Sequence, residues 1–86
     1  MFVLVTYDVP AKRTRIYRKL LRKHLEHIQY SVFYGDITKG QLVTIQNEIE
    51  SALEPDDSVY IFESDVSASV ECTVFGDADE PGSRFT

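Results

Sequence analysis

The spacing of apolar and polar residues along the chain predicts a series of short strands and helices. Residues 2–7 are apolar, β-branched or aromatic, and Asp8 and Pro10 follow them at once, which predicts a buried strand. From Ala11 to about Leu25 the apolar positions have helical spacing, and Pro10 suits the first turn of a helix. The apolar side of this helix is expected to hold Ile16, Leu20, Leu21 and Leu25, with Tyr17 and Ile28 nearby.

A second β-rich segment follows the first helix. Residues 27–34 are rich in aromatic and β-branched side chains, which predicts a strand. Gly35 and Asp36 form a typical turn dipeptide. We therefore expect a turn at these two residues and a second short strand that continues through Ile37.

The rest of the chain repeats this order. Gly40 to Leu53 carries apolar residues at helical spacing, and residues 54–57 should end that helix. Residues 58–63 predict a strand with Val59 and Ile61 on one face and Tyr60 and Phe62 on the other. Residues 70–75 predict a last strand, and residues 76–86 have the composition of a flexible C-terminal tail.

This order of elements predicts an α+β fold. We expect a ferredoxin-like βαββαβ sandwich with an extra C-terminal strand and two helices on one face of an antiparallel sheet. Residues 1–75 should form a single domain, followed by the tail of residues 76–86. The aromatic residues exceed what two small helices should bury, which favours a homodimer through the open sheet face. They are Tyr7, Tyr30, Phe33, Tyr34, Tyr60 and Phe62.

Composition narrows the class of protein. The chain has 86 residues, 43% of them hydrophobic and 27% charged, which is typical of one small globular domain. It has no apolar run near the roughly 18 residues of a membrane span. Met1 is followed directly by apolar residues without a basic leader, so we expect a cytoplasmic protein. The single Cys72 excludes a disulfide within one chain.

The positive charge is concentrated in the first predicted helix. The net charge is -5, but seven of the nine lysines and arginines lie between Lys12 and Lys23. Arg15, Arg18, Lys19 and Arg22 recur at three- and four-residue steps. Such a stripe is either a solvated helix face or a phosphate-binding surface, because guanidinium groups bind phosphate oxygens in pairs.

Asp8 and two histidines are the other candidates for chemistry. A carboxylate at a strand end either binds a hard cation such as Mg²⁺ or turns the chain before Pro10. Two copies of Asp8 across a dimer axis would complete a magnesium site. His24 and His27 are either a metal pair or side chains at a helix end, and His27 is also a candidate to contact phosphate or donate a proton. The sequence holds no nucleotide-cofactor motif.

Several segments taken together resemble a known family. They are Tyr7-Asp8-Val9, Arg13 and Arg15 in a basic helix, residues 28–33 (IQYSVF), Gly35-Asp36, and residues 57–62 (DSVYIF). In this order they resemble the second universal CRISPR-associated protein family, the small adaptation subunit that partners the CRISPR integrase. The resemblance covers about residues 1–63.

This resemblance implies a function and site residues. It implies a ferredoxin-like homodimer whose last strand, here residues 70–75, joins the partner's sheet. The dimer would bridge the integrase and hold prespacer DNA, and some members are Mg²⁺-dependent nucleases on single-stranded RNA or duplex DNA. Asp8 would be the catalytic, metal-binding carboxylate, and Arg13, Arg15 and Phe33 would contact nucleic acid. His27 stands where many relatives have a basic residue, often arginine.

Three interpretations remain open from the sequence. The chain is a CRISPR adaptation subunit with Mg²⁺-dependent endonuclease activity, or a structural nucleic-acid-binding adaptor without catalysis, or a toxin-like metal-dependent ribonuclease. A dimer with only a protein partner is the plainest alternative. The nucleic-acid-binding residues expected in the first interpretation are Arg13, Arg15, Arg18, Arg22, His27 and Phe33.

Overall fold

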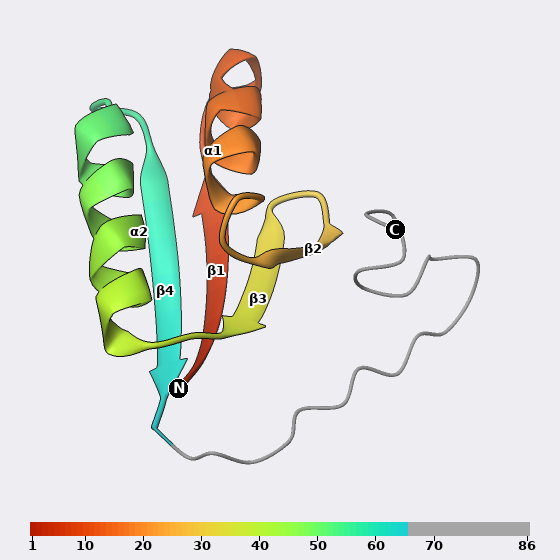
Figure 1. Ribbon diagram of the computed structural model, residues 1–86. Helices are drawn as coiled ribbons and strands as arrows, with labels where there is room; N and C mark the ends of the chain where they lie inside the picture. The colour runs from red at the N-terminus through yellow and green to blue at the C-terminus, as the bar shows by residue number, and fades with distance from the viewer. Residues whose placement is uncertain (66–86) are drawn as a thin grey trace, which may run out of the picture.

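A four-stranded antiparallel sheet with two helices on one face forms the described part of the molecule (Figure 1). The computed structural model of the protein describes residues 1–65. The strands lie in the order β2-β3-β1-β4, with β1 and β3 in the centre. The strands are β1 (Phe2–Asp8), β2 (Glu26–Gln29), β3 (Val32–Asp36) and β4 (Ser58–Ser64), and the helices are α1 (Thr14–Leu21), preceded by a 3₁₀ turn (Ala11–Arg13), and α2 (Lys39–Ala52).

This arrangement confirms the predicted ferredoxin-like fold. Each half of the chain runs from a strand through a helix to another strand, and all neighbouring strands are antiparallel. The predicted last strand at 70–75 and the boundary between residues 75 and 76 lie outside the described residues.

Alternation along β1 separates the core from the open face of the sheet. Val3 and Val5 are fully buried and Tyr7 is nearly so, whereas Leu4 and Thr6 face the other side. This period of two is the expected geometry of a strand with one covered face. Val3, Val5 and Tyr7 share one core cluster with buried residues of both helices. Figure 1 shows the two helices on one face of the sheet.

The first helix is shorter than predicted and buries a different side. It ends at Leu21 rather than near Leu25, which lies buried in the following turn. Tyr17 and Leu21 are fully buried, but Ile16, expected on the buried side, is 42% exposed. Tyr17 and Leu21 lie four residues apart on the inner side of the helix, so the adjacent Ile16 lies away from that side.

The turn predicted at Gly35-Asp36 was placed wrongly. Both residues lie inside β3, and the turn is formed by Tyr30 and Ser31, which divide residues 27–34 into two strands. Tyr30 has φ 44°, the left-handed conformation that reverses the chain. This conformation costs a non-glycine residue about 1–2 kcal/mol, so propensity alone would not have selected it.

Gly35 serves close packing instead of a turn. A Cβ atom at this position would lie 2.8 Å from Cδ2 of Leu25. The missing side chain lets the turn after α1 cross close to β3.

The second helix agrees with its predicted position to within one residue at each end. Thr38 caps it: its Oγ1 accepts from the Gln41 amide at 3.1 Å, and Gln41 Oε1 accepts from the Thr38 amide at 2.8 Å. This reciprocal capping box satisfies two amides of the helix start. Neither helix within residues 1–65 combines the length and apolar character needed to cross a membrane.

The open face of the sheet carries the remaining aromatic side chains. Tyr60 and Phe62 of β4 are 54% and 59% exposed and lie opposite Thr6 and Leu4 of β1. Tyr34 lies opposite Leu4 on the other side. Of the six aromatic residues expected on this face, Tyr7 and Phe33 belong to the core instead. The exposed aromatic surface is therefore smaller than the sequence predicts.

Candidate nucleic-acid interface

Asp8 is the last residue of β1 and is exposed. The alternation of β1 puts its side chain on the same face as Leu4 and Thr6, and Ser58 of β4 is its neighbour in the sheet. The carboxylate of Asp8 makes no hydrogen bond or ion pair within residues 1–65. The carboxylate is thus free to accept a ligand from outside.

A hollow of about 330 Å³ begins beside Asp8. Arg18 of α1 contributes a guanidinium to its wall, and the turn between β2 and β3 contributes Tyr30 and Ser31. Burial raises the pKa of the Tyr7 phenol, another lining group, and the positive charge of Arg18 opposes this shift. Asp8 and Arg18 therefore border one hollow, in which the guanidinium would attract an anion.

The outer face of α1 forms a second, purely cationic hollow of about 400 Å³. Its walls are Arg15, Arg18, Lys19 and Arg22, the stripe expected from the sequence, and all four residues are exposed. Arg18 borders both hollows. A phosphate chain that follows the helix would therefore arrive at Asp8.

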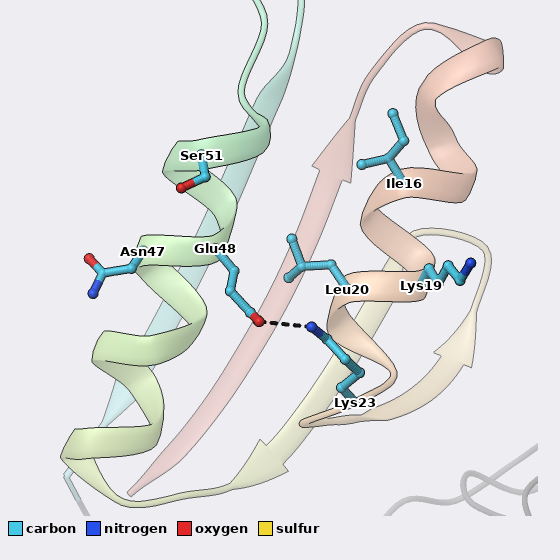
Figure 2. A pocket seen from close by; sticks show the side chains of 7 residues that line it. All are labelled: Ile16, Lys19, Leu20, Lys23, Asn47, Glu48 and Ser51. Atoms are coloured by element: carbon cyan, nitrogen blue, oxygen red, sulfur yellow. Dashed lines mark hydrogen bonds and ion pairs between the residues drawn. The ribbon is translucent and has the colours of Figure 1, made fainter.

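A larger groove between α1 and α2, of about 620 Å³, is a different surface (Figure 2). Its floor is apolar, with Ile16 and Leu20, and Lys23 crosses it to Glu48 with a 2.8 Å ion pair (Figure 2). The side chain of Lys19 points away from α2 in the same view. Lys23 is thus neutralised by Glu48, whereas Lys19 remains available to an external anion.

Glu48 also binds His24, so the two histidines do not form a metal pair. His24 Nε2 lies 2.7 Å from Glu48 Oε2. The hydrogen bonds from Lys23 and His24 hold the pKa of Glu48 below its usual value. His24 belongs to the contact between the turn after α1 and α2, as a side chain at a helix end.

Arg13 is placed inside the fold and does not belong to the exposed stripe. Its Nε donates to both oxygens of Asp57, at 3.0 and 3.1 Å, and its Nη2 donates to the Ala52 carbonyl at 2.6 Å. Its side chain is 18% exposed. In this structure the Arg13 guanidinium fastens the start of α1 to the end of α2, and its expected contact with nucleic acid stays a prediction.

Asp57 is the centre of this contact. Its side chain is fully buried and also accepts from Tyr17 Oη at 2.6 Å and from the Glu54 amide at 3.0 Å. The hydrogen bond from Arg13 is the main cause that lowers the pKa of Asp57 to about 2. A buried carboxylate with this many donors stays ionised and holds three segments together.

His27 and Phe33 form part of the core and do not face a polyanion. Phe33 is fully buried, and the His27 ring stacks on it at a centroid distance of 4.4 Å. His27 is 8% exposed, and its Nε2 donates to the Tyr30 carbonyl at 2.7 Å. Both side chains are thus buried in the single chain, and their expected contact with nucleic acid stays a prediction. They support the turn that borders the Asp8 hollow.

A magnesium ion fits Asp8 only in part. Mg²⁺ takes oxygen ligands and retains several waters, so one carboxylate can contribute to a site but cannot build it. Within residues 1–65, no three histidine, cysteine, aspartate or glutamate side chains come together. The exposed, unpaired Asp8 suits a site shared with a second copy.

Three residues of this region escaped the sequence reasoning. The sequence pattern indicates only a helix stop at Asp57 and a position near the apolar stripe for Tyr17. The two residues are 40 positions apart, and only the fold brings them into contact. Tyr30 was counted among aromatics of the sheet. The adjacent Ser31 between two strand-like segments was the only local sign of a turn.

Comparison with known proteins gives a consistent result. A family model described as CRISPR associated protein Cas2 matches residues 1–69. A CRISPR-associated endoribonuclease Cas2 of Haloferax volcanii is 66% identical over 86 residues, with 100% of both chains covered. A crystal structure of a cas2 protein superposes with a TM-score of 0.80 at 33% identity, covering 94% of this chain and 92% of that one. A Streptococcus pyogenes Cas2 structure has a TM-score of 0.68 at 31% identity, covering 74% and 86%.

The Asp57 contact predicts an acid-sensitive fold. The folded pKa of about 2 lies below the unfolded value of about 3.9, so the stabilisation exists above the unfolded value and is lost as pH falls through the folded value. Urea unfolding followed by circular dichroism should show stability falling from about pH 4 to pH 2. In Asp57→Asn this loss should be smaller, from a lower starting stability.

The neighbouring Asp56→Asn is the matched control, because Asp56 is exposed. It should keep the pH dependence of the wild type. If Asp57→Asn does not fold, Tyr17→Phe gives the same test, since the loss of one donor should move the acid transition to higher pH. An unchanged transition in both variants would contradict the assignment.

Proposed function

Because this chain belongs to the CRISPR-associated Cas2 family, we propose that it acts in CRISPR adaptation as a homodimeric, nucleic-acid-binding subunit with Mg²⁺-dependent endonuclease activity. The observation that carries the proposal is the exposed, unpaired Asp8 at a hollow that it shares with Arg18. The relatives' name of endoribonuclease supports a phosphodiester substrate. Family membership also supports a contact with the CRISPR integrase and a prespacer DNA ligand.

The stripe on α1 supplies the nucleic-acid affinity. Arg15, Arg18 and Lys19 are exposed, and with Arg22 they line one hollow. Contacts of this kind bind phosphates, set position on the strand and carry no base sequence. The acidic remainder of the chain, which gives the net charge of -5, confines a polyanion to this face.

The open sheet face supplies the dimer contact. Tyr60 and Phe62 are more than half exposed beside Leu4 and Thr6, and Asp8 continues the same face at the end of β1. A second copy packed on this face would cover the aromatic rings. It would also bring two Asp8 carboxylates toward one symmetry axis.

In the proposed reaction, the side chains of this chain bind and orient the phosphodiester. The two Asp8 carboxylates would hold Mg²⁺, which supplies polarisation of the scissile phosphate and a more acidic bound water. Arg18, at the same hollow, donates to the phosphate oxygens and stabilises the negative charge that develops there. The Tyr7 phenol, with its raised pKa, stays protonated beside them.

A structural adaptor is the second candidate function. It is favoured because residues 1–65 gather no cluster of three ligating side chains, so that a tight metal site at Asp8 would depend on the dimer. In this case the stripe on α1 would still bind nucleic acid, and Asp8 would be dispensable. A toxin-like ribonuclease would use Asp8 in the same way as the proposed enzyme but would not need the integrase.

Removing the carboxylate separates the enzyme from the adaptor. Asp8→Asn should lower the Mg²⁺-dependent cleavage of single-stranded RNA or duplex DNA by more than about 100-fold, because the metal supplies several kcal/mol of transition-state stabilisation. Binding of the same oligonucleotide should remain. Asp56→Asn is the control with normal cleavage. Equal cleavage by Asp8→Asn and wild type would leave only the adaptor.

Removing two charges from the stripe tests the binding surface. The double variant R15Q/R18Q should bind duplex or single strands more weakly, and the slope of log affinity against log salt should become shallower by about 1.4 to 1.8. Fluorescence anisotropy over a salt series measures both. Lys39→Gln, at the start of α2, should behave as wild type. A wild-type slope in R15Q/R18Q would show that nucleic acid binds elsewhere.

A charge on the open face tests the dimer. Phe62→Glu should give a monomer in light scattering after size exclusion, because a carboxylate would be buried against the partner's aromatic face. Val43→Glu is the control: Val43 is similarly exposed, at 53%, but lies on α2. A dimer in Phe62→Glu, or a monomeric wild type, would rule out this interface.

A further inference from the structure

Tyr30 combines an exposed ring with a strained backbone. Tyr30 is 86% exposed. Its backbone φ of 44° lies in the left-handed region, which glycine and asparagine adopt more readily than tyrosine. A ring with so little buried area adds little to the stability of the fold. A residue kept in an unfavourable conformation without a packing benefit indicates a functional role.

Neighbouring groups fix the turn that carries this ring. The buried His27 donates to the Tyr30 carbonyl at 2.7 Å and is itself stacked on Phe33. The Ser31 carbonyl accepts from the Tyr7 amide at 3.3 Å, which joins the turn to the end of β1. The backbone of Tyr30 is therefore held in place, while its side chain remains exposed to solvent.

The position of Tyr30 selects the kind of ligand. Tyr30 lines the hollow of about 330 Å³ together with Asp8, Arg18 and Ser31. An aromatic face, a guanidinium and a hydroxyl side by side match the two parts of a nucleotide, a flat base and a phosphodiester. Bases in the interior of a duplex are already stacked on both faces, so along a strand the Tyr30 ring is accessible only to an unpaired base.

We propose that Tyr30 is a stacking platform for an unpaired base of a strand whose backbone is bound by Arg18 beside Asp8. The inference rests on the proposed function, since it assumes that this hollow receives a phosphodiester. It deepens that function by selecting a single-stranded segment as the ligand at the Asp8 hollow. Ribose and deoxyribose strands share the chemistry, and the test distinguishes them.

The test measures binding and folding in the same variants. Tyr30→Gly and Tyr30→Asn should bind a single-stranded oligonucleotide about 5- to 100-fold more weakly, the range seen when a stacking aromatic is removed. Tyr30→Phe should bind as wild type, because the ring is retained. A 2-aminopurine base in the strand should be quenched by wild type and Tyr30→Phe but not by the other two. All binding is measured in EDTA, so that no strand is cut.

Three outcomes support the inference together. The thermal midpoint of Tyr30→Gly should equal or exceed that of wild type, because the left-handed conformation suits glycine. Affinity for a blunt duplex should stay within about twofold of wild type. The loss should appear with an RNA or a DNA single strand, and the strand with the larger loss is the one that stacks on Tyr30.

Other outcomes would overturn it. A lowered thermal midpoint in both Tyr30→Gly and Tyr30→Asn would give the ring a structural role. Equal losses for duplex and single strand, or no loss, would remove the stacking platform. If single-strand binding depends on Tyr30 but cleavage does not depend on Asp8, only the nuclease proposal fails. If cleavage depends on Asp8 but single-strand binding does not depend on Tyr30, only the present inference fails. Failure of wild type to bind any strand contradicts both.

Discussion

The buried carboxylate of Asp57 sets the position of α1 and thereby of the cationic surface. It accepts from Arg13 and Tyr17, at the start and the middle of the helix region, and from the Glu54 amide before β4. A buried charge without these donors would be costly, so the contact favours one placement of the helix over the sheet. Because Arg18 follows Tyr17 directly, this placement also sets where Arg18 borders the hollow that Asp8 lines. The stability of the fold and the geometry of the interface thus depend on the same residues.

Ion pairs within the fold divide the basic residues into two groups. Arg13 is held by Asp57 and Lys23 by Glu48, so neither adds to the field outside the molecule at full strength. Arg15, Arg18 and Lys19 remain exposed on one side of α1. The surface field is therefore narrower than the count of basic residues indicates, and a polyphosphate would meet it along one line that leads to the end of β1.

The sequence predicts the framework well and the inward or outward direction of single side chains poorly. The strands, the second helix and the exposed end of β1 follow from the local spacing of apolar residues. This spacing indicates which face of a single strand or helix is buried, but not what packs against that face. The turn at Tyr30 was missed because residues 27–34 all favour strands, while the glycine of the supposed turn is needed only for the approach of Leu25. Arg13, His27 and Phe33 turned inward because their partners lie far along the chain or across a hairpin, and no local pattern records such partners. The roles that resemblance implies for them were tied to chain position, which leaves the direction of the side chain undetermined.

The open sheet face links assembly to chemistry. Asp8 extends the row of Leu4 and Thr6, so any copy that packs on the aromatic rings also approaches this carboxylate. Two carboxylates near one axis repel each other when no cation lies between them, and this repulsion opposes the close dimer. A divalent cation removes that repulsion, and a strand laid along α1 would bring its phosphate to the same point. In the proposed dimer, metal binding, close approach of the subunits and arrival of the phosphodiester therefore favour one another. Tyr30 and Arg18, which need no partner subunit to form their hollow, can receive the strand before that approach is complete.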